Sequence, residues 1–145
     1  MKLSTRSRYG LRLMLALARN YGKGNTFLKH IAREEDISEK YLSLIIIPLK
    51  GVGLVNSIRG SSGGYMLAKA PSQITLKDIV NVLEGDCLID CVKNPNACPR
   101  VSTCAARDVW TLLGDKISET LNGITLEQLV IMNKEKMEQT ISPSI

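Results

Sequence analysis

The spacing of three residues near the start of the chain constrains its fold most strongly. Ala32 is small enough to lie where two helices cross, Asp36 follows four residues later where a turn is expected, and Leu42 follows six residues after that at a core position. Aspartate tolerates the left-handed backbone conformation better than most residues, so it suits a tight turn between two helices. The spacing therefore predicts a helix-turn-helix, and Ser38 can cap the helix that follows the turn.

Apolar periodicity predicts the extent of the helices in this region. We expect a first helix over about 4–21, a second over 27–35 and a third from Glu39 onward. Pro48 should kink or end the third helix, because proline lacks the amide hydrogen that helical bonding requires. The third helix is expected to bury an apolar stripe that consists of Leu42, Ile45, Ile46 and Leu49.

Two short strand patterns follow the third helix and flank a glycine-rich segment. The strands at 54–58 and 65–68 are separated by residues 59–64, and together they predict a β-hairpin, or wing. Glycines allow the tip of such a loop to approach a phosphate backbone closely. A nucleotide-binding phosphate loop fits poorly, because no Gly-Lys-Ser/Thr ends the segment and a strand follows it.

Charge is distributed unevenly along the 145 residues. Residues 1–70 carry 12 Lys/Arg and 4 Asp/Glu, a balance of +8, whereas residues 71–145 carry 7 and 10, a balance of −3. The two balances sum to the net charge of +5. A basic half that also has the helix-turn-helix pattern predicts binding to double-stranded DNA.

The DNA-binding side chains are predicted from their places in this pattern. Lys40 suits a phosphate or a guanine, and Leu44 suits a thymine methyl group. Arg59, at the base of the hairpin, suits the adjacent minor groove. Residues near the N-terminus are expected to steer the protein by charge. The full predicted set is Lys2, Arg6, Ser38, Lys40, Tyr41, Ser43, Leu44 and Arg59.

All four cysteines of the chain lie within eighteen residues, at Cys87, Cys91, Cys98 and Cys104. The sequence shows no export signal and no membrane-spanning run, so we expect a cytoplasmic protein without membrane contact, in which structural disulfides are uncommon. The crowding suggests a shared metal, a cluster or reactive thiols. From spacing alone an iron–sulfur cluster, a zinc site, a thiol–disulfide switch and plain structural cysteines all stay open.

Helices are also predicted on both sides of the cysteines. A short helix from Thr75 to about Leu83 precedes them, a long helix from about Cys104 to Leu121 follows, and Thr125 caps a last helix. Since the winged domain is complete before it, we expect the long helix to pair two copies of the chain. The alternative is that this helix packs on its own domain. Its apolar stripe consists of Val109, Leu112, Leu113, Ile117 and Leu121.

The expected fold class is mainly α with a small β-hairpin wing, a winged helix-turn-helix plus a long dimerisation helix. We expect a winged DNA-binding domain at 1–70 and a short helix with a cysteine loop at 71–103. The dimerisation and C-terminal helices are expected at 104–138, and a disordered tail at 139–145. An enzyme is not expected, because the one histidine, His30, lies far from the cysteines and no paired carboxylates accompany it.

Five segments resemble the winged-helix transcription regulators of the IscR/NsrR/CymR type, the Rrf-two family. These segments are 3–10, 37–42, 53–60, 63–65 and 122–129, and the similarity extends from residue 1 to about 130. The resemblance implies a homodimer that binds a DNA operator and regulates transcription, with repression as the expected effect. In many members three cysteines before the long helix hold an iron–sulfur cluster whose state tunes DNA binding.

By this resemblance Cys91, Cys98 and Cys104 are the expected cluster ligands, with Cys87 as a candidate fourth. The resemblance leaves the expected cluster type open between 2Fe–2S and 4Fe–4S. The expected regulator senses iron–sulfur, redox or nitric oxide status through it. The alternative is a thiol-redox or zinc-dependent regulator of the same fold without a cluster.

Two positions depart from the family pattern. A histidine that follows the last cysteine in the IscR branch is replaced by Arg107. The Glu-Gln pair that often follows Tyr-Leu in the recognition helix is replaced by Ser43 and Leu44. The operator sequence of a relative therefore does not transfer to this chain.

Overall fold

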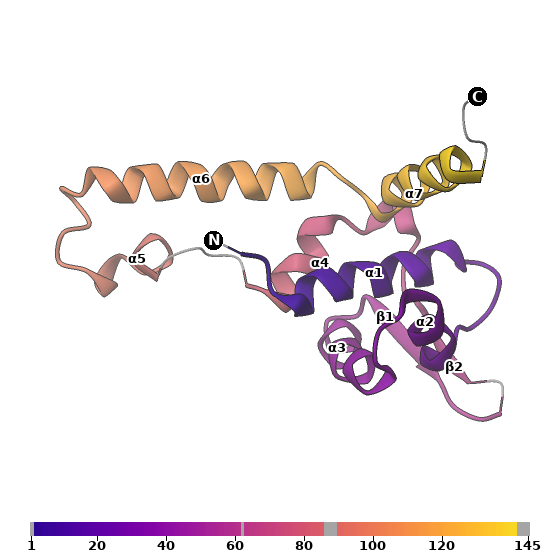
Figure 1. Ribbon diagram of the computed structural model, residues 1–145. Coiled ribbons are helices and arrows are strands. Elements are labelled where there is room, and N and C mark those ends of the chain that lie inside the picture. The colour runs from indigo at the N-terminus through magenta and orange to yellow at the C-terminus, as the bar shows by residue number, and fades with distance from the viewer. Residues whose placement is uncertain (1, 62, 86–89, 142–145) are drawn as a thin grey trace.

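The computed structural model describes residues 2–61, 63–85 and 90–141, with the backbone alone at 90 and 91. Helices α1 (Thr5–Arg19), α2 (Leu28–Glu35) and α3 (Glu39–Gly51) precede strands β1 (Val55–Ile58) and β2 (Gly64–Leu67). The 3₁₀ helix η1 (Pro71–Gln73), α4 (Leu76–Leu83), α5 (Asp90–Lys93) and the 3₁₀ helix η2 (Pro95–Ala97) come next. Helices α6 (Ala105–Asn122) and α7 (Leu126–Ile141) follow. The predicted fold class is confirmed, since one β-hairpin accompanies a mainly helical chain (Figure 1).

The helix-turn-helix forms as its spacing predicts. Asp36 ends α2 with φ 53° and ψ 48°, and it is the one non-glycine residue with positive φ in the described part of the chain. Ser38 caps α3, because its hydroxyl oxygen accepts a hydrogen bond from the Tyr41 amide at 3.2 Å. The predicted stripe of α3 is buried at all four positions, Leu42, Ile45, Ile46 and Leu49.

Two helix ends differ from the expectation. The sequence predicts that Pro48 kinks or ends α3; the helix continues through Pro48 to Gly51, so the proline does not end it, and the kink stays a prediction. The carbonyl that loses its helical partner there belongs to Leu44, which lies on the exposed side of the helix where water can replace the bond. Helix α7 reaches Ile141, so residues 139–141, expected in a disordered tail, are helical; no glycine or proline interrupts them before Pro143.

The wing is attached to the helix-turn-helix by a backbone bridge. Strands β1 and β2 pair antiparallel, with Val55 opposite Leu67 and Ile58 opposite Gly64. Thr26, just before α2, then exchanges two backbone hydrogen bonds with Tyr65, each of 2.8 Å. This bridge fixes strand β2, close to the loop of the hairpin, relative to the start of α2.

Helix α1 lies at the centre of the packing. Leu13, Met14 and Leu17 are almost fully buried, and α3, α4, α7 and β2 all contact this helix. Gly10 marks its closest approach, because a Cβ atom added there would lie 2.2 Å from Leu83 Cδ1 of α4 and 3.4 Å from Ile45 Cγ2 of α3. A larger residue here would therefore require the Leu83 side chain to move.

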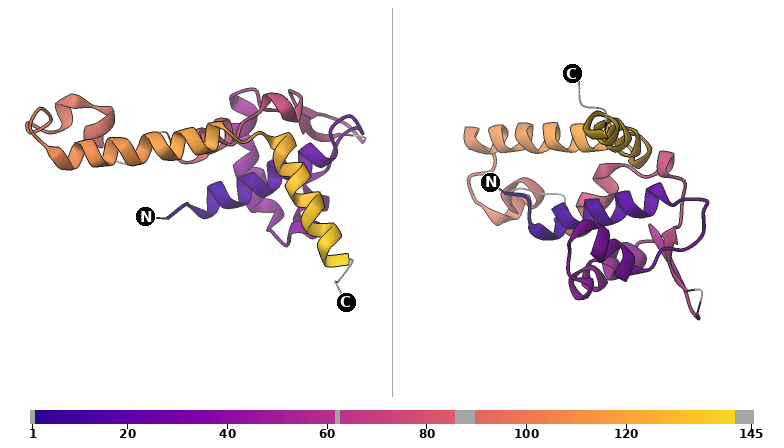
Figure 2. Two further views of the ribbon diagram at one scale, coloured as in Figure 1. Left: turned by 90° about the horizontal axis from the view of Figure 1, so that it is seen from above. Right: turned by 45° about the vertical axis from the view of Figure 1, so that its right-hand side comes forward.

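Helix α7 returns to this core, whereas most of α6 does not. Backbone hydrogen bonds join Leu126 to the Ile74 carbonyl at 2.8 Å and Leu76 to the Ile124 carbonyl at 2.9 Å. The predicted caps Thr75 and Thr125 each accept a hydrogen bond from the third residue of the following helix. None of the described residues of α6 is buried, and the left view of Figure 2 shows this helix extending away from the body.

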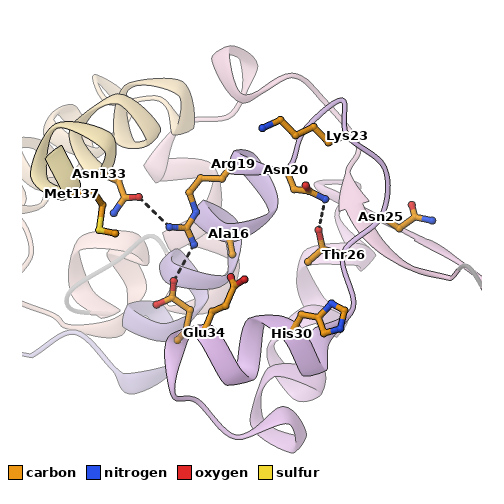
Figure 3. A pocket seen from close by; sticks show the side chains of 11 residues that line it. Ala16, Arg19, Asn20, Lys23, Asn25, Thr26, His30, Glu34, Asn133 and Met137 are labelled. Atoms are coloured by element: carbon orange, nitrogen blue, oxygen red, sulfur yellow. Dashed lines mark hydrogen bonds and ion pairs between the residues drawn. The ribbon is translucent and has the colours of Figure 1, made fainter. Parts of the chain in front are cut away.

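A cavity of about 880 Å³ lies between α1, α2 and α7 (Figure 3). Its polar side chains largely bind one another. The Asn20 amide donates to Thr26 Oγ1 at 2.7 Å, and the Arg19 guanidinium donates to Asn133 Oδ1 at 3.1 Å. His30 also lines the cavity; it is exposed on α2, and its ring meets Phe27 edge-on.

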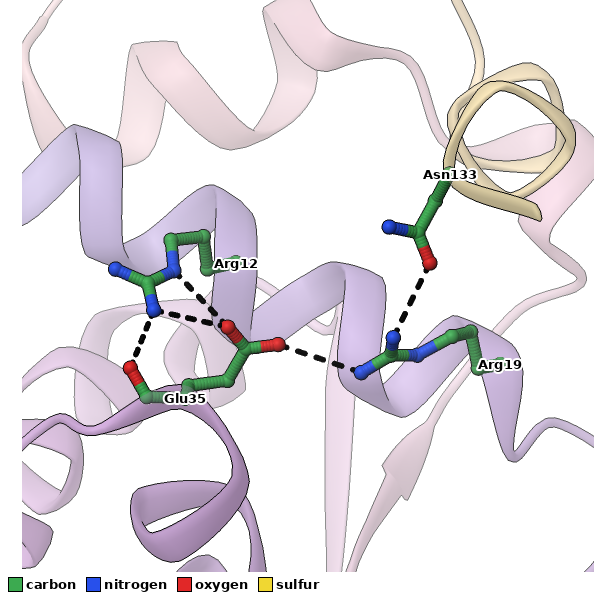
Figure 4. A network of polar contacts seen from close by, with 4 residues as sticks. All are labelled: Arg12, Arg19, Glu35 and Asn133. Atoms are coloured by element: carbon green, nitrogen blue, oxygen red, sulfur yellow. Dashed lines mark hydrogen bonds and ion pairs between the residues drawn. The ribbon is translucent and has the colours of Figure 1, made fainter. Parts of the chain in front are cut away.

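A network around Glu35 holds the turn in place (Figure 4). Its carboxylate accepts a hydrogen bond from Arg12 Nε at 3.0 Å and from Arg19 Nη2 at 3.3 Å, and its backbone carbonyl accepts a further bond from Arg12. Arg19 in turn binds Asn133 of α7. Because Glu35 precedes the left-handed residue Asp36, the network ties the turn to both α1 and α7.

Replacing Glu35 with glutamine should test this network, since the change removes the charge shared by two arginines and keeps the size. We expect the free energy of unfolding to fall by about 1 kcal/mol, as for a partly buried charged hydrogen bond. Urea denaturation measures it. The control is Glu119→Gln, which removes the exposed Lys116–Glu119 pair of 3.5 Å and should change stability by less than about 0.5 kcal/mol. Equal effects of the two substitutions would contradict the role given to Glu35.

Candidate DNA interface and cysteine loop

The face of α3 opposite its core stripe is exposed. Lys40, Leu44 and Ile47 lie on it, and the two aliphatic residues are 57% and 63% exposed. Lys40 and Leu44 are thus exposed, and their contact with DNA stays a prediction. Ile47 was not among the predicted residues, although its place three residues after Leu44 and outside the core stripe was a usable signal.

The three other predicted residues of α3 take part in contacts within the protein. Ser38 caps the helix, and the Ser43 hydroxyl donates to the Lys40 carbonyl at 2.6 Å. Tyr41 is half-buried, and its ring meets the Tyr9 ring edge-on with centroids 5.8 Å apart. Tyr41 thereby anchors the start of α3 on α1, and the exposed face is left mainly to Lys40, Leu44 and Ile47.

A hollow of about 570 Å³ separates the wing from α2 and α3. Arg59 is exposed on its wing side, and Lys29 of α2 and Lys50 of α3 line the opposite side. Three cations from three elements thus surround one concave surface, with Glu39 as the acidic residue among them. Lys29 and Lys50 were missed by the sequence reasoning because only the fold brings them together with Arg59.

The predicted residues Lys2 and Arg6 are exposed at the start of α1. There the Ser4 amide donates to Glu84 Oε1 at 2.5 Å, which joins this end of the chain to the end of α4. The hydrogen bonds from Ser4 lower the pKa of the Glu84 carboxyl, and the charge of Arg6 adds to this effect. Arg6 therefore lies close to an acidic group of its own chain.

The elements that carry three of the cysteines contact one another. The backbone of Cys91 lies in α5, Cys98 ends η2 and Cys104 caps α6, and α5 packs against both η2 and α6 (Figure 1). Cys98 and Cys104 are free thiols, each half-buried. Cys87 lies outside the described residues.

Thiolates suit an iron–sulfur cluster or zinc, so the donor chemistry of these cysteines fits either group. Among the side chains that the structure describes, no three histidines, cysteines or carboxylates converge on one metal position. Arg107, which stands where a histidine follows in the IscR branch, is half-buried on α6. Helices long and apolar enough to cross a membrane are absent from the described ranges.

Comparison with known proteins finds the same two kinds of relative, CymR and IscR, among sequences and among solved structures. The transcriptional regulator CymR of Bacillus subtilis (strain 168) is 43% identical over 129 residues, which is 89% of each chain. The solved structure of T. potens IscR shares 36% identity with a TM-score of 0.78, covering 94% of this chain and 90% of that one. The solved structure of Staphylococcus aureus CymR in its oxidized form also shares 36% identity, with a TM-score of 0.72, covering 90% and 96%.

The Rrf2 family model, described as an iron-dependent transcriptional regulator, matches residues 3–131. That match spans the winged domain, the cysteine loop, α6 and the start of α7. The relatives named above are transcriptional regulators and not enzymes. From its sequence and its fold alike, the chain belongs to the Rrf2 (Rrf-two) family of transcriptional regulators.

Proposed function

We propose that the chain is a sequence-specific DNA-binding repressor that acts as a homodimer and responds to the state of its cysteine loop. The observation that carries the DNA-binding part is the exposed face of α3 beside a hollow lined by Lys29, Lys50 and Arg59. A protruding helix with cations on its flank matches the shape and the charge of a major groove between two phosphate backbones.

In this proposal α3 enters the major groove and the wing lies along the adjacent backbone. Lys40, near the N-terminal end of α3, approaches a phosphate or a guanine. The hollow receives the phosphate backbone between Lys29, Lys50 and Arg59, and Arg59 reaches into the minor groove. Lys2 and Arg6 add long-range attraction, and the negative charge of the neighbouring Glu84 carboxylate offsets part of the field of Arg6.

Homodimerisation is supported by the surface of α6. Val109 and Leu112 are 56% and 59% exposed, Trp110 is 40% exposed, and no described residue of the helix is buried. Such an apolar face on a helix that leaves the body is stabilised by pairing with a second copy. Two-fold pairing would also present two α3 helices to half-sites about 34 Å apart, or a multiple of that spacing.

The cysteine loop connects the winged domain with α6, so a change in the loop can act on both. It connects α4, whose end is tied to α1 through Glu84 and Ser4, with the N-terminus of α6. Cys91, Cys98 and Cys104 would hold an iron–sulfur cluster, with Cys87 as a candidate fourth ligand. Such a cluster, when bound, supplies a group that oxidants, nitric oxide or iron shortage can alter. A change in loop shape could then alter the angle between the winged domain and α6, and with it the operator affinity.

A thiol-redox switch without a cluster is the second candidate. Two observations favour it, namely the free, half-buried thiols of Cys98 and Cys104 and the existence of an oxidized form of a 36% identical CymR. In that case two thiols lose two protons and two electrons to an oxidant such as a peroxide and form a disulfide. Constitutive zinc binding is the remaining alternative, in which the loop would be rigid and the DNA affinity constant.

Arg59→Ala should weaken binding to an operator selected from random duplexes by roughly tenfold and reduce the slope of affinity against salt by about one ion. The reason is the loss of one cation from the hollow. Fluorescence anisotropy at several salt concentrations measures both quantities. Lys134→Ala, an exposed cation on α7, is the control and should change neither. Full affinity and selectivity in the Arg59 variant would refute the role of the wing.

Leu112→Asp should convert the dimer into a monomer, because a pair of carboxylates would be buried between the two α6 helices. Sedimentation equilibrium should give a mass near the 16.0 kDa of one chain for the variant and twice that value for the unmodified protein. Val52→Asp is matched in exposure and lies on the winged domain, so it should stay dimeric. If the Leu112→Asp variant stayed dimeric, α6 would not be the surface that pairs two chains.

Joint replacement of Cys91, Cys98 and Cys104 by serine should abolish any difference in operator affinity between aerobic and anaerobic protein. The unmodified protein, purified without oxygen, should be brown or reddish and contain iron and acid-labile sulfide, whereas the variant should be colourless. Colourless unmodified protein with a disulfide after oxidation would favour the thiol switch, and stoichiometric zinc would favour the structural metal. Identical affinities of variant and unmodified protein under both conditions would rule out sensing by these cysteines.

A further inference from the structure

The recognition helix exposes two large aliphatic side chains that the core does not use. Leu44 is 57% exposed and Ile47 is 63% exposed, while the buried apolar residues of α3 occupy the opposite face. Residues three apart in a helix are neighbours on its surface, so the two side chains form one apolar patch. Exposed aliphatic residues on a helix aimed at a partner indicate that the partner offers apolar groups there.

Beyond Lys40, the middle of this face has little capacity for hydrogen bonding. Ser43, next to Leu44, uses its hydroxyl to donate to the Lys40 carbonyl at 2.6 Å. Leu44 also stands where the family often has a glutamine, a side chain that can form two hydrogen bonds with adenine. Around the middle of α3, direct recognition must therefore come mainly from apolar contact.

Charge around the patch restricts what can cover it. Lys40 lies one helical turn before Leu44, Lys50 lies three residues after Ile47, and both lysines are exposed. An apolar centre between cations fits a surface that places apolar groups between rows of anions. The major groove of DNA has this arrangement, because thymine methyl groups project into it between the phosphate backbones.

We propose that Leu44 and Ile47 recognise thymine by contact with the methyl groups of two thymines, so that this pair determines part of the operator sequence. Three residues of helix advance by about 4.5 Å, close to the rise of one base-pair step of about 3.4 Å, so the two side chains suit neighbouring base pairs. The proposal rests on the proposed DNA-binding function and adds to it the chemical group that is read and a residue, Ile47, that reads it.

The test uses the full-length protein and its preferred duplex, selected from random sequences. Each thymine of a half-site is replaced in turn by deoxyuridine, which removes only the methyl group. At two neighbouring positions we expect each lost methyl group to raise the dissociation constant by about fourfold. This factor corresponds to the free energy gained by burying one methyl group. Leu44→Ala should lose the penalty at one position and Ile47→Ala at the other, because the partner of that methyl group is gone.

Two controls separate this effect from general weakening. Ile131→Ala, an isoleucine of α7 that is 51% exposed, should retain both deoxyuridine penalties. Lys29→Ala should weaken the thymine and deoxyuridine duplexes by the same factor, because it removes a phosphate contact. Thermal unfolding of the two α3 variants should match that of the unmodified protein, since both side chains lie outside the core.

The outcomes distinguish the two levels of the proposal. Selection of a specific duplex that binds equally well with thymine or deoxyuridine would overturn methyl recognition and leave the DNA-binding function standing. Deoxyuridine penalties that persist in both alanine variants would overturn the assignment to Leu44 and Ile47. Failure to select or bind any duplex would refute the proposed function itself, and the patch would then be assigned to a protein partner.

Discussion

The close packing around α1 is the constraint on which the rest of the structure depends. At Gly10 the helices α1, α3 and α4 approach so closely that a Cβ atom would displace the Leu83 side chain, and just beyond it Leu13, Met14 and Leu17 fill the core. Helices α3, α4 and α7 and strand β2 take their positions from this one helix. The positions of α3, the wing and α4, which leads to the cysteine loop, are therefore all fixed relative to α1.

Much of the winged domain could be predicted from the sequence, because its turns and caps depend on residues close together in the chain. Asp36 and Ser38 act through their own backbone and the next turn, so short-range rules sufficed for them. Two features could not be predicted in this way. The Thr26–Tyr65 bridge joins distant segments, and Pro48 is accepted within α3 only because the unpaired carbonyl lies on the solvent side.

The candidate DNA interface could be predicted in part. Lys40, Leu44 and Arg59 are exposed as expected, whereas the Tyr41 ring packs against Tyr9 of α1. This contact joins residues far apart in the sequence, so the local pattern of α3 could not predict it. Lys29 and Lys50 belong to the same hollow only through folding. For the cysteines, the sequence and the resemblance define the set, and the structure adds that α5, η2 and α6 contact one another. Their shared ligand stays a proposal.

The bridge between Thr26 and Tyr65 attaches strand β2 to the start of α2 at a point close to the loop of the hairpin. Because α2 is joined to α3 through the Asp36 turn, the position of the hairpin strands relative to α3 is set by the fold. Adjustment to a particular duplex is then confined to the glycine-rich tip. In the proposed complex with DNA, the spacing between α3 and the hairpin strands would therefore be the same in every chain.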